Sequence, residues 1–338
     1  MDLLLEKLIS DEKKENNHLY SSGKYWKKKN LKTIYQLKKK KLTNFRGLNS
    51  GVGTSFADNL PTDIGNELNF AGRIVYKLIN LPLINKIFLS QTSITLDYAK
   101  HIIKYLSVLY KKSHIVEKLI KKYKFEDTVN FGCCQKFTYN NKDYSNLYLE
   151  IANRVENISN YLNLKSYKSY FEIGGGFGAN VDFIISNFPN IKKIIYLDSV
   201  PNLYVGTMYL KKKYNDNVKD YLELKDKKIN FSNDNNLEIF CIAPWQIVNL
   251  DTEIDHFHNA SSFVEMPKYI IKNYLKYIFK NDLKSISLVT YKIFDPNTTI
   301  DPYSLNSFFD KKLDVHEFPT AVEELSRKDI YYIKNYDN

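Results

Sequence analysis

The segment Tyr170-Phe-Glu-Ile-Gly-Gly-Gly-Phe-Gly-Ala-Asn180 joins a short apolar run to a turn rich in glycine. The apolar run predicts a buried strand over Ser169–Ile173, and the spacing after the turn predicts a helix over Asn180–Phe188. Three glycines lie two residues apart, at Gly174, Gly176 and Gly178. Glycine lets the chain turn tightly and lets a ligand approach the backbone. The segment therefore predicts a strand, loop and helix that bind a nucleotide cofactor.

Two acidic residues flank this unit. Glu172 lies two residues before the first glycine, and Asp198 follows a second predicted strand, Lys193–Leu197. A carboxylate at the position of Asp198 can bind the hydroxyls of a ribose. Glu172 favours a cofactor that carries an ammonium group, as S-adenosylmethionine does, because the pyrophosphate of a dinucleotide would be repelled by a neighbouring carboxylate.

Two other interpretations of the glycine segment stay open. The residues Gly174, Gly176 and Ala179 can be placed on the dinucleotide fingerprint G-x-G-x-x-A. Alternatively, the segment is a turn that binds nothing, although four glycines in the five residues 174–178 would then cost conformational entropy without a packing return. Glu172 makes S-adenosylmethionine the preferred cofactor.

Three later blocks resemble the sugar O-methyltransferase family of bacterial surface-glycan gene clusters. The blocks are Asp198-Ser-Val-Pro-Asn-Leu-Tyr-Val-Gly-Thr-Met-Tyr-Leu210, Cys241-Ile-Ala-Pro-Trp-Gln246 and Asn259-Ala-Ser-Ser-Phe-Val-Glu-Met-Pro267. The likeness covers about residues 145–309, and it is weaker at Trp26, Asn44-Phe-Arg46 and Gly51-Val-Gly-Thr54. The resemblance implies an α/β, class I methyltransferase fold, Rossmann-like with a mostly parallel sheet. It also implies transfer of a methyl group from S-adenosylmethionine to a sugar hydroxyl.

The predicted cofactor site collects residues from several of these blocks. Its residues are Glu172, Gly174, Gly176, Gly178, Asp198, Trp245, Gln246 and Asn259. We expect Glu172 to hold the amino acid end of the cofactor and Trp245 with Gln246 to border the adenine. For Trp245, simple packing under a loop is an equal alternative.

Transfer to a hydroxyl also calls for a base, because sugar hydroxyls are poor nucleophiles at neutral pH. The stretch Asp255-His-Phe-His-Asn259 is expected to close a strand over Ile254–His258, which would place His258 at the edge where ligands of α/β sheets bind. Glu265, in the third block, is the second candidate. We interpret His256 as structural and predict no metal site, because the sequence singles out no further ligands for the histidine pair.

The chain order predicts two parts. Residues 1–140 are expected to form a helical N-terminal cap, and residues 141–338 the methyltransferase domain. Helical spacing covers Leu3–Ile9, Lys24–Lys40, Thr62–Ile79 and Ser93–Lys122 in the first part and Tyr144–Leu162, Asn202–Tyr214 and Pro267–Phe279 in the second. Further strands are expected over Leu237–Ile242 and Ser285–Tyr291. The polar stretch Lys225–Asn236 is expected to be an exposed, mobile loop, and Tyr291 to begin a polar loop at the ligand-binding edge.

Composition limits the partners. The chain has 338 residues and a formal net charge of +11, but only four of its 49 basic residues are arginine. Proteins that recognise nucleic acid often use the bidentate guanidinium group of arginine. Ala243-Pro-Trp245 also lacks the polar first residue of motifs that methylate nucleic-acid bases. Both features disfavour a nucleic-acid partner. The lysine clusters at residues 27–29, 38–41 and 211–213 could attract an anionic glycan, a nucleotide-sugar or a membrane surface.

The sequence favours a cytoplasmic location. No apolar run reaches the roughly 18 residues of a membrane span, the first residues do not resemble a secretory signal, and an odd number of cysteines fits a reducing compartment. The predicted activity is methylation of a sugar in a surface polysaccharide or its nucleotide-linked precursor. The alternatives are a nucleic-acid or small-molecule methyltransferase with the same donor site, and a non-catalytic glycan-binding module.

Overall fold

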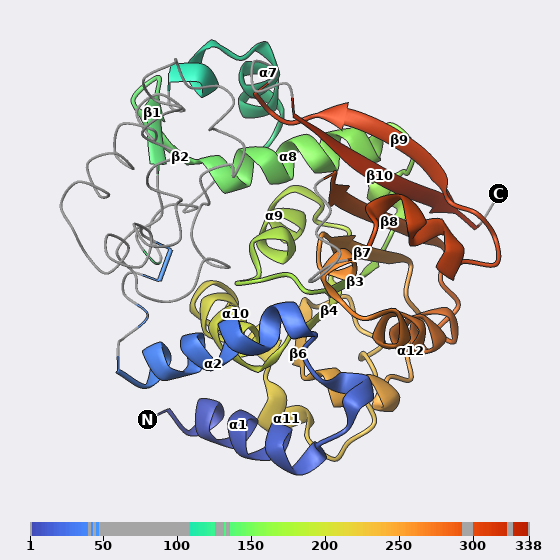
Figure 1. Cartoon of the computed structure of the whole chain (residues 1–338). Coiled ribbons are helices and arrows are strands. Elements are labelled where there is room, and N and C mark those ends of the chain that lie inside the picture. Colours follow the sequence, from blue (N-terminus) through green and yellow to red (C-terminus); the bar gives the residue numbers. More distant parts are fainter. Residues whose placement is uncertain are drawn as a thin grey trace, which may run out of the picture.

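The fold is a three-layer α/β arrangement around one large sheet (Figure 1). The computed structural model describes residues 2–39, 42, 45–46, 108–125, 132, 136–292, 300–322 and 327–336. In spatial order the sheet contains β5 (Val218–Lys219), β6 (Glu238–Ile242), β4 (Lys193–Leu197), β3 (Ser169–Ile173), β7 (His256–Ala260), β8 (Ser285–Tyr291), β10 (Lys328–Asn335) and β9 (Asp314–Pro319). Six of these eight strands, β5 to β8 with β3 and β4, run parallel. Only β10 is antiparallel to both of its neighbours.

The strand order reverses at β3. From β3 the chain first builds outward through β4 to β6, and it then returns to the other side of β3 with β7 and β8. Ligands of open α/β sheets bind outside the carboxyl ends of the strands at such a reversal. This order confirms the class I methyltransferase fold, which is Rossmann-like with a mostly parallel sheet, and it directs attention to the ends of β3 and β7.

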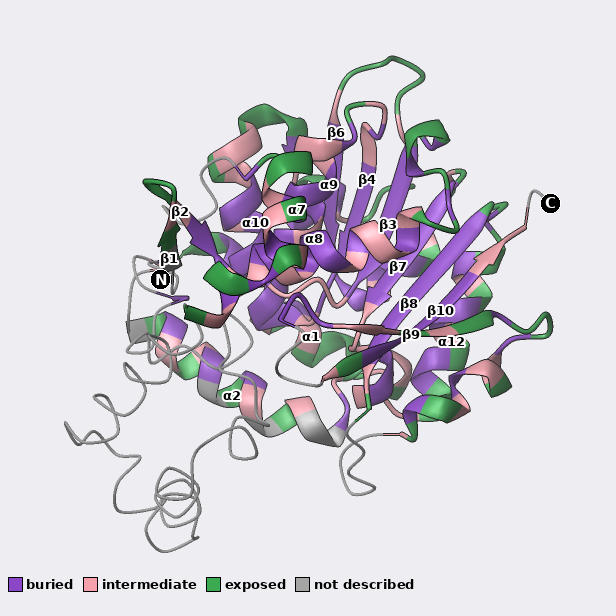
Figure 2. Ribbon diagram, turned by 90° about the horizontal axis from the view of Figure 1, so that it is seen from above, coloured by how far each residue is buried: buried purple, intermediate pink, exposed green. Residues whose placement is uncertain are grey.

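Helices cover both faces of the sheet, and each face has its own hydrophobic core. The flanking helices are α8 (Asn146–Ser159), α9 (Ala179–Asn187), α10 (Val200–Tyr214), α11 (Tyr221–Leu224) and α12 (Lys268–Phe279). One core joins α8, α9 and α10 to alternate residues of the sheet such as Tyr170 and Tyr196. The other joins α12 to Phe171, Phe257 and their neighbours. Figure 2 shows β3, β4, β7 and β8 buried, as strands covered on both faces should be.

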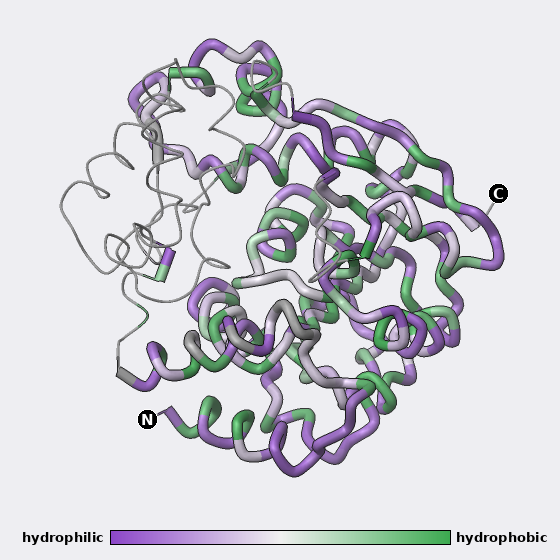
Figure 3. The backbone as a smooth tube through the Cα atoms, viewed as in Figure 1, coloured by the Kyte–Doolittle hydropathy of each residue, from purple (hydrophilic) through white to green (hydrophobic). Residues whose placement is uncertain are grey.

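Helices also make up most of the described N-terminal part. They are α1 (Leu3–Glu15), α2 (Lys24–Lys39) and α7 (His114–Lys122). Hydrophobic and hydrophilic residues alternate along α1 (Figure 3), and its buried leucines Leu4, Leu5 and Leu8 belong to the core that contains α10. No helix in the described ranges is long and apolar enough to cross a membrane. The predicted helix over Thr62–Ile79 and most of the one over Ser93–Lys122 lie outside the described residues.

Several predicted boundaries need correction. The strand expected over Ile254–His258 begins and ends two residues later, because the side chain of Asp255 accepts the backbone N–H groups of Lys168 and Ser169 before the ladder starts. The hairpin of β1 (Lys136–Tyr139) and β2 (Lys142–Ser145) was not expected, and its turn contains the predicted division at residue 140. The antiparallel pair β9 and β10 was not expected either. That division into cap and domain stays a prediction.

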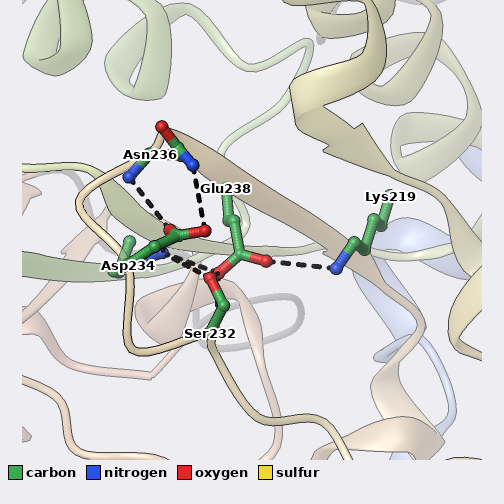
Figure 4. Close-up of polar contacts among 6 residues, drawn as sticks. Lys219, Ser232, Asp234, Asn236 and Glu238 are labelled. Atoms are coloured by element: carbon green, nitrogen blue, oxygen red, sulfur yellow. Dashed lines mark hydrogen bonds and ion pairs between the residues drawn. The ribbon is translucent and has the colours of Figure 1, made fainter.

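The polar loop before β6 is mostly exposed, as expected, and ion pairs tie its end to the sheet. Glu238 accepts hydrogen bonds from Lys193 at 2.8 Å, from Lys219 at 3.1 Å and from the backbone of Ser232 at 2.8 Å. Figure 4 shows Glu238 between Ser232 and Lys219, with Asp234 held by Asn236. Although burial raises it, these hydrogen bonds lower the pKa of Glu238 to about 2.

Candidate active site

The glycine loop follows β3 and has the conformation that its sequence requires. Gly174, Gly176 and Gly178 have φ angles of 77°, 64° and 89°, which side chains rarely allow. A Cβ atom on Gly174 would lie 2.2 Å from Oγ of Ser262, so the start of the loop also needs glycine for space. Gly178 then caps the N-terminus of α9. The predicted strand, loop and helix are therefore present.

Glu172 lies in β3 just before this loop, and its carboxyl group is fully buried. Nδ2 of Asn180 donates to Oε1 at 2.5 Å, whereas Oε2 has no hydrogen-bond partner among the described residues. Burial raises the pKa of Glu172 to about 8, with the nearby Asp198 adding to the effect. A buried carboxylate oxygen without a partner is costly, so the site favours a cationic ligand beside it.

Asp198 follows β4 and is joined directly to the glycine loop. Its Oδ2 accepts the backbone N–H of Gly176 at 2.8 Å, and its Oδ1 accepts that of Ser199 at 2.6 Å. The hydroxyl of Tyr196 in β4 donates to the carbonyl of Gly176 at 2.5 Å, so a residue of the strand and the residue that follows it both hold the loop. Burial raises the pKa of Asp198 to about 7, although its hydrogen bonds lower it. Each carboxylate oxygen can accept more than one hydrogen bond, which leaves Oδ2 able to accept a ligand hydroxyl.

Trp245 and Gln246 follow β6, the next strand along this edge. Oε1 of Gln246 accepts the backbone N–H of Ala243 at 2.9 Å, and its buried Nε2 has no hydrogen-bond partner among the described residues. Trp245 is partly buried and meets the ring of Tyr221 edge to face at 5.8 Å. The edge thus offers an unused amide donor next to an aromatic ring.

Asn259 holds the turn after β7 against the end of β3. Its Nδ2 donates to the carbonyl of Ile173 at 2.7 Å and to Oγ of Ser262, and its Oδ1 accepts the backbone N–H of Phe263 at 3.0 Å. Since Ser262 also limits the space at Gly174, Asn259 fixes the relative positions of the glycine loop and the segment that carries Glu265.

Glu265 lies in this segment, at the carboxyl edge of the sheet, and receives two donors from distant parts of the chain. Nε1 of Trp26 in α2 donates to Oε2 at 2.8 Å, and the hydroxyl of Tyr291 at the end of β8 donates to Oε1 at 3.0 Å. Burial raises the pKa of Glu265, whereas Trp26, Tyr291 and the charge of Lys29 lower it. The sequence predicted that Glu265 and Tyr291 lie at this edge of the sheet. No spacing in the sequence indicated that Trp26 contacts Glu265.

His256 and His258 lie elsewhere, beneath α8 within one face of the sheet. His258 lies in β7 two residues before the strand ends at Ala260, opposite Glu172 in the register, and its side chain is buried and not open to the ligand-binding edge as expected. Its Nδ1 pairs with Oγ of Ser287 at 2.8 Å, and burial lowers the pKa of His258 to about 3. The adjoining cavity has a volume of about 10 Å³, too small for a sugar or a cofactor. His258 is therefore a neutral imidazole in the core at neutral pH.

His256 has the buried, hydrogen-bonded position expected of a structural residue. Its two ring nitrogens pair with Oγ of Ser285 at 2.8 Å and of Ser287 at 2.9 Å. No group of three metal-ligating side chains exists within the described ranges. Cys241 is a free, buried thiol, and burial raises its pKa to about 12. Cys133 and Cys134 lie outside the described residues.

Comparison with known proteins gives structural resemblance alone. No protein-family model and no curated protein matches the chain. It is similar to the mitomycin 7-O-methyltransferase MmcR (TM-score 0.38, 12% identity, over 56% of this chain and 53% of that one). Human N-acetylserotonin methyltransferase in complex with SAM gives a TM-score of 0.36 at 12% identity, over 56% of this chain and 54% of that one. The similar region spans about half the length of both enzymes. At such values the fold assignment rests on the strand order described above.

Proposed function

We propose that the protein is an S-adenosylmethionine-dependent O-methyltransferase that methylates a sugar hydroxyl in a surface polysaccharide or its nucleotide-linked precursor. The observation that carries the proposal is the buried Oε2 of Glu172, which has no hydrogen-bond partner among the described residues and adjoins the glycine loop. An ammonium group bound there would satisfy the orphaned oxygen and stabilise its charge. The pyrophosphate of a dinucleotide would instead be repelled.

The rest of the donor site fits the same cofactor. Glu172 would hold the ammonium group, the glycines would admit the cofactor to the backbone, and Asp198 would accept a ribose hydroxyl. Nε2 of Gln246 and the ring of Trp245 would contact the adenine, while Asn259 would keep the turn after β7 in place. When bound, S-adenosylmethionine supplies a methyl group on a positively charged sulfur.

We propose Glu265 as the base and a structural role for His258. The acceptor oxygen forms a bond to the methyl carbon while the bond from sulfur to carbon breaks, its electron pair stays on sulfur, and Glu265 takes the hydroxyl proton. Glu265 lies at the ligand-binding edge, and its raised pKa increases its basicity. His258 is enclosed in the core, and its lowered pKa makes it a weak base.

A sugar acceptor is supported by the three blocks that resemble sugar O-methyltransferases. The low arginine content and the apolar residue that begins Ala243-Pro-Trp245 argue against a base of nucleic acid. The free thiol of Cys241 supports a cytoplasmic location. The alternatives are a nucleic-acid or small-molecule methyltransferase and a glycan-binding module without activity.

The test is transfer of a labelled methyl group from S-adenosylmethionine to three separate acceptor pools. The first pool contains nucleotide-sugars and isolated surface glycans, the second contains RNA and DNA, and the third contains small phenols. We expect label in the first pool, as an alkali-stable ether, and an initial rate lower by at least about a hundredfold with Glu265→Gln. Label in nucleic acid that falls steeply with salt would favour the alternative acceptor. Binding of a nicotinamide dinucleotide in place of S-adenosylhomocysteine would contradict the proposed cofactor.

A further inference from the structure

The N-terminal helix α2 reaches the segment that carries the proposed base. Trp26 and Glu265 are 239 positions apart, yet Nε1 of the indole lies 2.8 Å from Oε2 of the carboxylate. The hydroxyl of Tyr291, at the end of β8, donates to the other oxygen, Oε1, at 3.0 Å. A carboxyl group held by one donor on each oxygen keeps a single orientation, because rotation would break both hydrogen bonds.

Close packing fixes the position from which Trp26 reaches Glu265. Gly23, just before α2, lies so near the turn after β7 that a Cβ atom there would be 2.8 Å from Cδ of Pro267 and 3.1 Å from the carbonyl oxygen of Glu265. Backbone hydrogen bonds then join Trp26 and Lys27 to the carbonyl of Gly23 at 3.0 Å and 2.9 Å. The first turn of α2 is therefore seated directly on the segment that carries Glu265.

The groups that surround the carboxylate come from two elements. From α2, the indole of Trp26 donates to it, and Nζ of Lys29 lies 4.8 Å from the centroid of the indole ring. From β8, the hydroxyl of Tyr291 donates to it. Both donors and the lysine charge favour the ionised carboxylate, and they oppose the burial that raises the pKa of Glu265.

We propose that Trp26 is a positioning residue for the base: its indole N–H holds the Glu265 carboxylate ready to accept the acceptor proton, so that α2 completes the acceptor side of the active site. This inference rests on the proposed function. It adds a residue from the N-terminal part of the chain, where the proposed donor site has none, and it gives α2 a role in methyl transfer beyond packing against α10.

The contact itself can be tested without activity. The chain has two tryptophans, Trp26 and Trp245, so Trp245→Phe leaves Trp26 as the single tryptophan, whose emission is separated from that of the tyrosines by selective excitation of the indole. We expect its emission to change with pH as Glu265 ionises, and we expect this transition to vanish in the double variant Trp245→Phe/Glu265→Gln. A transition that is unchanged by Glu265→Gln would overturn the inference.

The catalytic role is tested by the pH dependence of kcat. Trp26→Phe removes the donor and keeps an aromatic ring, so the rise of kcat with pH should move to higher pH, with kcat at pH 7 lower by about tenfold and the KM for S-adenosylmethionine within about twofold. Tyr291→Phe, which removes one hydroxyl, should move the profile in the same direction. The matched control is Tyr35→Phe on the exposed side of α2, which should leave the profile in place.

The outcomes separate this inference from the proposed function. Methyl transfer with wild-type pH profiles in Trp26→Phe and Tyr291→Phe would overturn the positioning role and leave the proposed function standing. A clear fluorescence transition that depends on Glu265, in a protein that transfers no methyl group to any acceptor, would contradict the proposed function and with it the catalytic use of the contact.

Discussion

Oδ2 of Asp198 accepts the backbone N–H of Gly176 at 2.8 Å, so the acid that follows β4 also holds the loop that follows β3. The loop and the acid therefore form one unit before any cofactor binds. A preformed site avoids the cost of ordering the loop on binding.

Gly174→Ala should weaken binding of S-adenosylhomocysteine by at least about tenfold and lower the free energy of unfolding by about 1–3 kcal/mol. The new Cβ atom meets Ser262 at 2.2 Å, and a φ of 77° is strained for alanine. Calorimetry and urea denaturation measure the two effects. The double variant Gly174→Ala/Ser262→Gly removes the clash and retains the strain, so it should recover part of the stability. No recovery would contradict the assigned clash.

Affinity for S-adenosylhomocysteine should rise with pH below about 8. Binding of an ammonium group requires Glu172 in its ionised form, and burial raises the pKa of Glu172 to about 8 in the free protein. Between pH 6 and 7 the gain should approach about tenfold, with a proton released on binding. Calorimetry in two buffers of different ionisation enthalpy counts that proton. The matched variant Glu172→Gln should bind weakly, without this pH dependence; a steep rise that persists in it would exclude Glu172 as the source.

The same residue should make the free protein less stable as the pH rises. Since the folded pKa of about 8 exceeds the ordinary value of 4.5, the stabilising effect of the protonated carboxyl is complete below about pH 4 and is lost as the pH rises through 8. Glu172→Gln should thus raise the free energy of unfolding at pH 8.5 by about 2–4 kcal/mol and change it little at pH 4. Urea denaturation at both pH values checks this, and equal effects at the two would contradict it.

Glu265→Gln should lower kcat by about a hundredfold to ten-thousandfold and leave affinity for S-adenosylhomocysteine nearly unchanged, because the base acts only as the acceptor oxygen attacks. His258→Gln keeps a polar group in the core and should retain most of the turnover if the folded protein survives. Initial rates with a labelled donor measure both, and circular dichroism confirms the fold. Loss of turnover in folded His258→Gln together with full activity in Glu265→Gln would reverse the two assignments.

Glu238→Gln should lower the free energy of unfolding at pH 7 by about 1–2 kcal/mol. The hydrogen bonds from Lys193 and Ser232 lower the pKa of Glu238 to about 2, so its contribution is present above the ordinary value of 4.5 and is lost as the pH falls through 2. The control is Asp251→Asn in the exposed pair with Lys228, which should change stability little. Urea denaturation of both variants at pH 7 measures the two changes in the free energy of unfolding. Similar losses of stability in the two variants would contradict a special role for Glu238.

Local patterns of the sequence predicted two strands and the glycine loop, on which the proposed donor site is built. The strands over Lys193–Leu197 and Ser285–Tyr291 have the predicted bounds, and the glycine loop has positive φ angles at the three predicted positions. Such features depend on neighbouring residues, because backbone conformation and the alternation of apolar side chains are local properties. The predicted bounds of β7 were wrong because a distant contact takes part. Asp255 accepts a hydrogen bond from the backbone just before β3, and β7 begins two residues later than predicted.

The sequence by itself determined the strand, loop and helix and the positions of the two acidic residues beside them. Only the tertiary structure decided that His258 lies in the core, that the buried Oε2 of Glu172 has no hydrogen-bond partner among the described residues, and that Trp26 meets Glu265. The physical reason is that burial and contacts between residues 239 positions apart arise from the packing of whole elements, which no local spacing encodes.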